Sequence, residues 1–221
     1  MQQLQRDYLF EFAGMPQSGK TMVKDIFVHY FKRMEYPFEE YHGGSGSSPL
    51  DHLPIGELNY LLAERTKTFV DCIVKRRNSN HKIYLLDQGL IDRCIFTDAL
   101  VNASKVSPSQ AEDIYSSLLS RDLLDRLDGV FIFVTSPQTA LIREYQDKLV
   151  KLEDVRSQGE VMNEKFLSKL QSATERWFKR AGNLGLIVKK IDTSQPDVEM
   201  RVKAREIFDT IQRNYPELDF I

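Results

Sequence analysis

Residues 14–21 read GMPQSGKT and fit the spacing G-x-x-x-x-G-K-[ST]. Glycines at both ends of such a loop let the backbone turn tightly, so that its N–H groups point inward and form a nest for an anion at the start of a helix. The lysine reaches the β- and γ-phosphates of ATP, and the hydroxyl after it coordinates Mg²⁺. The residues expected to contact the phosphates are Gly14, Pro16, Gln17, Ser18, Gly19, Lys20, Thr21 and Met22.

A second candidate for metal chemistry is Asp87, which directly follows an apolar run at residues 82–86. A carboxylate at the carboxyl end of a strand can hold a hydrated Mg²⁺ ion directly or through water. We therefore expect Thr21 and Asp87 to bind the metal, with Lys20 at the transferred phosphoryl group.

The elements that position these residues follow an alternation of strand and helix. Apolar runs predict strands at residues 8–13, 36–41, 82–86, 129–135 and 186–191. Helical spacing of apolar residues predicts helices at 21–34 and 55–74, and the residues expected on the buried side of the second are Leu58, Leu61, Leu62, Phe69 and Ile73. This alternation predicts an α/β fold, a five-stranded parallel sheet with helices on both faces.

Composition excludes several classes of partner. The chain has 221 residues and a formal net charge of −2, so we expect one domain over residues 1–221 with no positive field for long nucleic acid or an anionic membrane. No segment approaches the roughly 18 apolar residues of a membrane span. Cys72 and Cys94 are too few for a disulfide framework or a zinc site, and we expect both to be buried in a cytoplasmic protein.

The segment after the third predicted strand narrows the class of phosphate-binding protein. The N-K-x-D motif of GTPases and the strand-ending D-E of motor and AAA-type ATPases are absent, and residues 85–96 read LLDQGLIDRCIF. This segment resembles the thymidylate kinase and deoxynucleoside kinase group of P-loop kinases. Those enzymes end the third strand with an acidic residue and Arg, and the deoxynucleoside kinases continue with S-D-R-Y-I-F, where this chain has IDRCIF.

Three more segments extend the resemblance in the same order along the chain. LLAER at 61–65 is similar to the thymidylate kinase helix with A-D-R, whose arginine contacts the acceptor. VFIFVTSPQTALIRE at 130–144 resembles the fourth strand, the V-x-P-E-x-A-L turn and the arginine that opens the lid. IDTSQP at 191–196 resembles the I-D-A-S-Q-S loop that borders the adenine of ATP. The resemblance implies a three-layer P-loop NTPase fold with a lid at about residues 143–163.

The resemblance also implies an activity, the transfer of the γ-phosphoryl group of ATP to a nucleoside or nucleoside monophosphate with Mg²⁺. Residues expected at the acceptor are Glu39, Glu40, Tyr41, Arg65, Gln88 and Arg93, where one of the two glutamates accepts the proton of a 5′-hydroxyl. Residues expected to assist transfer are Lys20, Asp87, Arg93, Arg143 and Arg156, and those beside adenine are Ser194, Gln195 and Pro196. Because thymidylate kinase relatives are often dimers, a homodimer is also implied.

Two departures from the family pattern leave the acceptor open. Gln88 stands where the family has Arg, and YHGGSGSSP replaces the usual E-P-G-G-T after the second strand. A missing guanidinium at the reacting centre costs several kcal/mol unless another cation replaces it. The alternatives are a kinase of another small hydroxylated molecule and a nucleotide-binding regulatory subunit with slow turnover. His42 lies beside the glycine-rich loop and is the one histidine that we single out for testing.

Overall fold

A computed structural model gives the fold and describes residues 4–44, 53–75, 81–151, 161–195 and 198–218. Its five strands form one parallel sheet in the order β2-β3-β1-β4-β5. The strands are β1 (Tyr8–Gly14), β2 (Phe38–His42), β3 (Ile83–Asp87), β4 (Gly129–Val134) and β5 (Val188–Asp192). All five predicted runs form strands, whose ends differ from the prediction by at most two residues. The three central strands, β3, β1 and β4, are buried along their whole length, and such strands read as continuous apolar segments.

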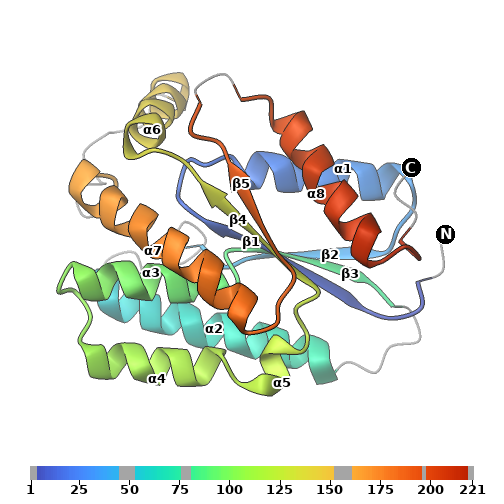
Figure 1. Cartoon of the computed structure of the whole chain (residues 1–221), viewed down its shortest axis with the longest axis horizontal. Coiled ribbons are helices and arrows are strands. Elements are labelled where there is room, and N and C mark those ends of the chain that lie inside the picture. The colour runs from blue at the N-terminus through green and yellow to red at the C-terminus, as the bar shows by residue number, and fades with distance from the viewer. Residues whose placement is uncertain (1–3, 45–52, 76–80, 152–160, 196–197, 219–221) are drawn as a thin grey trace.

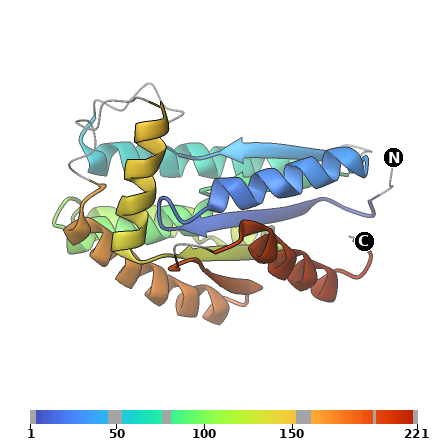
Figure 2. The ribbon, with the colours of Figure 1, turned by 90° about the horizontal axis from the view of Figure 1, so that it is seen from above.

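Helices cover both faces of the sheet, so the molecule is a three-layer α/β P-loop fold (Figure 1). One face carries α1 (Lys20–Arg33) and α8 (Met200–Asn214). The other carries α2 (Ile55–Lys75), α3 (Leu90–Asn102) and α7 (Glu164–Asn183), with α4 (Pro108–Leu118) and α5 (Arg121–Leu124) outside them. Helix α6 (Pro137–Lys151) lies at the carboxyl ends of the strands and contacts α7, with Ala140 buried in the same apolar cluster as Trp177 of α7 (Figures 1 and 2). The predicted architecture is thereby confirmed.

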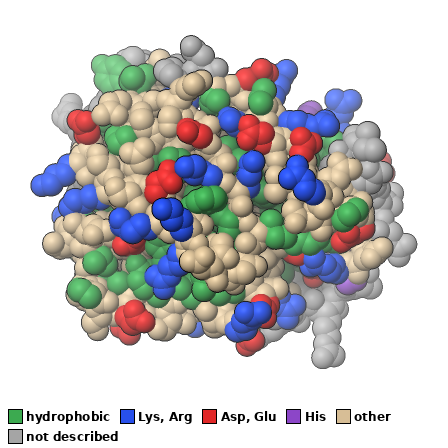
Figure 3. Space-filling model, viewed as in Figure 1, with side chains coloured by type: hydrophobic (Ala, Val, Ile, Leu, Met, Phe, Trp, Pro, Cys, Tyr) green, Lys and Arg blue, Asp and Glu red, His purple; other side chains and the backbone are tan. Residues whose placement is uncertain are grey.

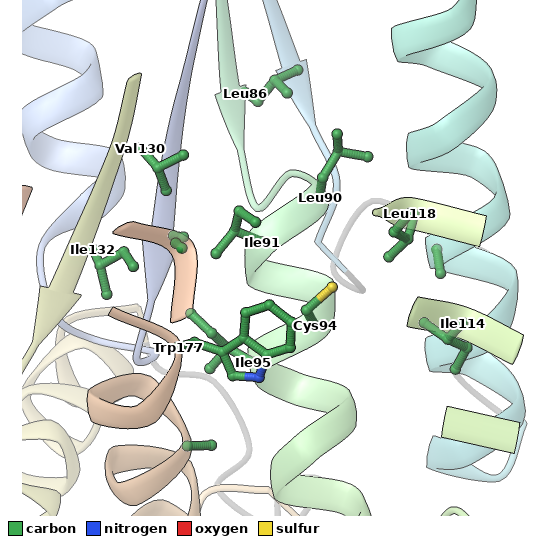
Figure 4. Close-up of a cluster of buried hydrophobic side chains, with 14 of the residues drawn as sticks. Leu86, Leu90, Ile91, Cys94, Ile95, Ile114, Leu118, Val130, Ile132 and Trp177 are labelled. Carbon is green, nitrogen blue, oxygen red and sulfur yellow. The ribbon is translucent and has the colours of Figure 1, made fainter. Parts of the chain in front are cut away.

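Two apolar clusters hold the sheet between these layers. The cluster beneath α1 and α8 is rich in aromatic rings, among which Phe27 and Phe208 stack with centroids 3.8 Å apart. The cluster beneath α2, α3 and α7 includes Ile91, Cys94 and Trp177 (Figure 4). Trp177 is 1% exposed. Burying side chains of this size stabilises the fold by roughly 1.5–3 kcal/mol each, which anchors the strand ends that carry the site.

Two predictions for helix α2 are wrong. Leu61 is 42% exposed and Cys72 is exposed, whereas Leu58, Leu62 and Ile73 are buried. Positions 61 and 72 are separated by about three full helical turns, so they share one outward stripe. The buried face of α2 is therefore narrower than its apolar sequence suggested. Cys94, on α3, is buried as expected.

The surface carries both signs of charge. On the face in Figure 3, lysine and arginine side chains are interspersed with aspartate and glutamate. Within the part of the chain that the structure describes, no helix has the length and apolar character needed to cross a membrane.

Candidate functional site

The loop between β1 and α1 begins with a glycine that no other residue could replace without rearrangement. Gly14 has φ +114°, and a Cβ atom there would lie 2.1 Å from the carbonyl oxygen of Phe133 on β4. Its N–H donates a hydrogen bond of 2.7 Å to Oδ1 of Asp92, a fully buried residue in the first turn of α3. The start of the loop is thus fixed by both neighbouring elements, β4 and α3, in the left-handed conformation that glycine tolerates.

Lys20 bends back over this loop. Its Nζ donates to the carbonyl oxygens of Gly14 at 2.9 Å and Met15 at 2.6 Å, and the residue is 6% exposed. Burial lowers the pKa of Lys20, while the carboxylates of Asp92 and Asp87 raise it in opposition. The ammonium therefore lies at the anion nest, held by carbonyl groups that a bound phosphate can replace.

The two predicted metal ligands contact each other. Thr21 Oγ1 donates a hydrogen bond of 3.1 Å to Oδ2 of Asp87, the last residue of β3. A hydroxyl and a carboxylate beside a phosphate loop are oxygen ligands of the kind that Mg²⁺ prefers. Among the residues described, no group of three or more His, Cys, Asp or Glu side chains could hold a metal. This sparse set suits Mg²⁺, which usually takes one or two carboxylates and keeps phosphate and water ligands.

These residues form the floor of an open cleft of about 920 Å³ at the carboxyl edge of the sheet. Its lining combines residues 16–22 with side chains from the ends of β2 and β3, from α6 and from the start of α8. The lining residues outside the loop are His42, Gly44, Asp87, Gln88, Arg143, Gln146, Asp147, Val198 and Met200. In open parallel sheets this edge is the usual place for ligands.

The two glutamates of β2 do not line the cleft. Glu39 forms an ion pair with Lys82, which precedes β3. Glu40 pairs with Lys24 of α1, with Oε2 and Nζ 2.9 Å apart. The strand alternation thus sends the two carboxylates to different partners.

The residue from β2 that does line the cleft is His42. Its Nε2 lies 2.9 Å from Lys24 Nζ, and its Nδ1 lies 3.5 Å from Asp87 Oδ2. Sequence reasoning singled out His42 only for its place beside the glycines and missed Lys24. No local sequence pattern predicts the contact between His42 and Asp87. It depends on the pairing of β2 with β3, which places His42 opposite Asp87.

Gln88 lies in the cleft with an uncommon backbone conformation. Its φ is +65°, and its Oε1 accepts a hydrogen bond of 3.3 Å from Arg93 Nη2. The loop after β2 packs closely on it, since a Cβ atom on Gly43 would lie 2.0 Å from the Gln88 carbonyl oxygen. Gly43 and Gly44, in the segment that replaces E-P-G-G-T, thus lie directly against Gln88, the residue that replaces the family's arginine.

Arg93 is buried at the start of α3, 3% exposed. Its Nη2 also donates to Asp92 Oδ2 at 2.9 Å, and its guanidinium lies 5.4 Å from the ring centre of Phe96. Among the residues that the structure describes, its Nε finds no hydrogen-bond partner. An unpaired buried donor of this kind costs free energy until a ligand or water binds it.

Two other buried polar atoms, one on β2 and one in α2, also have no partner within the described part of the chain: the hydroxyl of Tyr41 and Oδ1 of Asn59. The Tyr41 ring stacks on Phe69 with centroids 4.1 Å apart, and the Arg65 guanidinium lies 5.6 Å from its centre. Arg65 is exposed and lies outside the cleft lining. Asn59 was not among the predicted site residues.

A chain of hydrogen bonds fixes the direction of the Asn59 amide. The Thr97 hydroxyl donates to the Arg93 carbonyl at 2.7 Å, so its oxygen can only accept from Asn59. Asn59 accordingly presents Nδ2 to Thr97 at 2.8 Å. Oδ1 of Asn59 is left as a buried acceptor, which a hydrogen-bond donor would satisfy.

The loop predicted to border adenine, at residues 191–196, contacts the phosphate loop through its described residues, and Arg143 hydrogen-bonds to both loops. Its guanidinium donates to the carbonyl oxygens of Gln17 at 3.2 Å, Thr193 at 3.0 Å and Gln195 at 3.0 Å. Burial lowers the pKa of Arg143. Ser194 sits beside this junction, where its carbonyl accepts from Thr139 at 2.8 Å. Arg156 and Pro196 lie outside the described residues.

One buried carboxyl group, that of Glu11, holds the start of α3 beside the site. Glu11 of β1 is fully buried and accepts hydrogen bonds from the backbone N–H groups of Ile91 at 3.1 Å and Asp92 at 2.7 Å, at the start of α3. Burial raises its pKa from 4.5 to about 7, against the opposing effect of these N–H donors. The sequence feature that could have indicated this buried carboxyl group is the single charged residue, Glu11, inside the apolar run YLFEFA.

Three solved structures of deoxyadenosine kinase from M. mycoides share this fold. The structure with dCMP and a flexible dCDP has a TM-score of 0.65 at 12% identity and covers 93% of this chain and 99% of its own. The structures with dCTP and with dATP have TM-scores of 0.64 and 0.63 at 14% identity, and cover 93% and 92% of this chain and 99% of their own. No protein-family model and no curated protein matches the chain by sequence.

Proposed function

We propose that this protein is a phosphotransferase that moves the γ-phosphoryl group of ATP to a nucleoside or nucleoside monophosphate, with Mg²⁺. The observation that carries the proposal is the convergence of Lys20, Thr21 and Asp87 in one open cleft at the carboxyl edge of the sheet. Phosphoryl transfer asks for little covalent chemistry from the protein, so positioned cations and hydrogen-bond donors supply most of the rate.

On the donor side, the loop at residues 14–21 would hold the phosphates and Lys20 would exchange its carbonyl partners for phosphate oxygens. Ser194 and Gln195 would border the adenine, because Arg143 holds their loop against the phosphate loop. In this arrangement Arg143 positions the two halves of the ATP site. Arg156 and Pro196 keep the roles that the family resemblance implies, as part of this proposal.

Thr21 and Asp87 would hold Mg²⁺, with Asp87 acting directly or through water. When bound, the ion neutralises charge on the β- and γ-phosphates. Asp87 suits this role because β3 fixes its backbone and Thr21 already orients one of its oxygens.

The acceptor side is supported by the unpaired buried polar atoms. Tyr41 Oη can donate or accept, Arg93 Nε can only donate, and Asn59 Oδ1 can only accept. A nucleoside offers both hydroxyl donors and ring or carbonyl acceptors, so it could satisfy this set. We therefore assign the acceptor to the region between the ends of β2 and β3 and the first turns of α2 and α3. The fold shared with a deoxyadenosine kinase agrees with this choice.

Gln88 favours a second candidate, a kinase of another small hydroxylated molecule. A neutral amide stands at the expected arginine position, and it is engaged with Arg93. An acceptor without a phosphate group would need less positive charge there. The regulatory alternative, nucleotide binding with slow turnover, requires no acceptor.

An acceptor panel separates these functions. Pure protein is incubated with ATP, Mg²⁺ and, in turn, nucleosides, nucleoside monophosphates, and sugars or polyols, while ADP and phosphorylated product are measured. We expect product from at least one nucleoside or monophosphate, none from Lys20→Ala, and wild-type activity from the exposed control Lys165→Ala. Product only from a sugar or polyol favours the second candidate, and unstimulated ADP formation with no product would refute both kinase functions.

The acceptor region has its own test in Asn59→Leu. Removing Oδ1 should raise KM for the acceptor by about 10-fold, the loss of one or two kcal/mol expected when a buried hydrogen bond to a ligand is removed, with KM for ATP unchanged. A change in KM for ATP alone would place Asn59 outside the acceptor site.

A further inference from the structure

A buried lysine outside the phosphate loop connects α1 to the metal-binding region. The side chain of Lys24 is only 2% exposed, and its Nζ lies 2.9 Å from Glu40 Oε2, 2.9 Å from His42 Nε2 and 3.5 Å from Asp25 Oδ1. Lys24 follows Lys20 by one helical turn on the same side of α1. One ammonium group thus lies within 3.5 Å of three different side chains.

This contact determines which nitrogen of His42 carries the proton. An ammonium group donates hydrogen bonds and accepts none, so Nε2 must offer its lone pair to Lys24. The proton of the ring is then on Nδ1. Nδ1 lies 3.5 Å from Asp87 Oδ2, an electrostatic contact longer than an ordinary hydrogen bond.

Asp87 Oδ2 therefore faces two donors from two different elements, the Thr21 hydroxyl of α1 at 3.1 Å and the Nδ1–H of His42 on β2 at 3.5 Å. Both groups lie beside the same oxygen, so the Thr21 hydrogen bond and the attraction of the His42 ring favour one orientation of the carboxylate. The backbone pairing of His42 opposite Asp87 in adjacent parallel strands holds the imidazole at this place. The His42 side chain itself is half exposed and lines the cleft.

We propose that Lys24, Glu40 and His42 are positioning residues that orient Asp87 for the metal–nucleotide complex. The inference rests on the proposed function, because it takes Asp87 as a metal ligand. Glu40 and Lys24 fix the tautomer of His42, and His42 in turn fixes the carboxylate. Partners behind a metal ligand commonly change metal affinity or activity by about 10- to 100-fold when they are removed. This role also accounts for a lysine buried next to the cleft, since a buried ion pair contributes little stability by itself.

Two amide variants of His42 separate this role from simple packing. In His42→Asn the amide nitrogen occupies the place of Nδ1 and can still donate toward Asp87, whereas in His42→Gln it occupies the place of Nε2. Mn²⁺ is titrated by electron paramagnetic resonance in the presence of a saturating non-hydrolysable ATP analogue. We expect His42→Gln to weaken Mn²⁺ affinity by about 10-fold, and His42→Asn to stay within about 3-fold of the wild type.

Lys24→Met should weaken Mn²⁺ affinity to a similar extent. The double variant Lys24→Met/His42→Gln should be no worse than the single variants, since all of these residues act through one chain of contacts. The matched control is His81→Gln, because His81 precedes β3 at the amino ends of the strands, lies 3.8 Å from Asp7 and does not line the cleft. Thermal unfolding of each variant verifies the fold, and the two His42 variants decide the question if Lys24→Met does not fold.

Wild-type Mn²⁺ affinity in His42→Gln would overturn the inference, as would equal losses in His42→Gln and His42→Asn, which indicate shape rather than a donor at Nδ1. These outcomes leave the proposed function intact, because the wild-type protein still binds the analogue with Mn²⁺. Failure of the wild-type protein to bind the analogue in a metal-dependent way would refute the proposed function, and this inference with it.

Discussion

Replacement of Glu11 by glutamine should remove a pH dependence of stability that the fold imposes. Glu11 is fully buried, and Asp92 and Arg93 face the same carboxyl group from α3. Burial raises its pKa from 4.5 in the unfolded chain to about 7 in the folded protein. Between these values the unfolded chain releases a proton that the folded protein retains. The folded state is therefore favoured by Glu11 at low pH and loses that advantage as the pH rises through 7.

The magnitude follows from the two pKa values. The difference between 4.5 and about 7, at about 1.4 kcal/mol per pH unit, corresponds to about 3 kcal/mol. Most of it develops between pH 5 and pH 8, where the free energy of unfolding of the wild type should fall by about 2.5 kcal/mol relative to Glu11→Gln. The glutamine cannot ionise, while its oxygen can still accept one N–H of the α3 start.

Urea unfolding of both proteins at pH 5, 6, 7 and 8 measures this difference directly. Glu112→Gln, a change at an exposed position of α4, serves as the control and should track the wild type at every pH. Parallel curves for wild type and Glu11→Gln would refute the reasoning, and a difference that grows in favour of the wild type with rising pH would reverse its sign.

Three further substitutions test the loops of the cleft. Gly14→Ala forces a Cβ atom to within 2.1 Å of the Phe133 carbonyl and should lower Tm by about 10 °C or more in thermal unfolding, whereas a Tm within about 2 °C would show that the loop adapts. Arg143→Lys cannot maintain a fork of donors to two loops, so KM for ATP should rise about 10-fold with little change in Tm, and an unchanged KM would remove Arg143 from the ATP site. Gln88→Arg sets a second guanidinium beside Arg93 and should change either kcat or the preferred acceptor in the panel assay; identical kinetics on every acceptor would show that this position is idle.

The strands and the phosphate loop could be predicted from the sequence, because each is encoded by residues that are close together in the chain. Strands buried on both faces form unbroken apolar runs, and the phosphate loop has a fixed spacing between a strand and a helix. Thr21 and Asp87 were predicted as neighbours, and the structure brings their side chains into contact. Helix α2 was predicted less well, because Leu61 is apolar and yet points to solvent.

The remaining features depend on contacts between distant segments. Lys24 has the sequence environment of a solvated helix residue, yet β2 covers it and supplies Glu40 and His42 as partners. The meeting of His42 with Asp87 requires the strand order, with β2 beside β3, and the register of that pair. The free oxygen of Asn59 likewise follows from a hydrogen bond to Thr97 on another helix. Neither periodicity nor motif spacing encodes such pairings.

The central claim is that the cleft transfers phosphate to an organic acceptor. The most direct measurement supplies γ-³²P-labelled ATP and Mg²⁺ together with the best acceptor of the panel, and follows where the label goes. The account predicts that the label appears on a nucleoside or nucleoside monophosphate in the wild-type protein and not in Lys20→Ala. Label that appears only in inorganic phosphate, or equal transfer by Lys20→Ala, would contradict it.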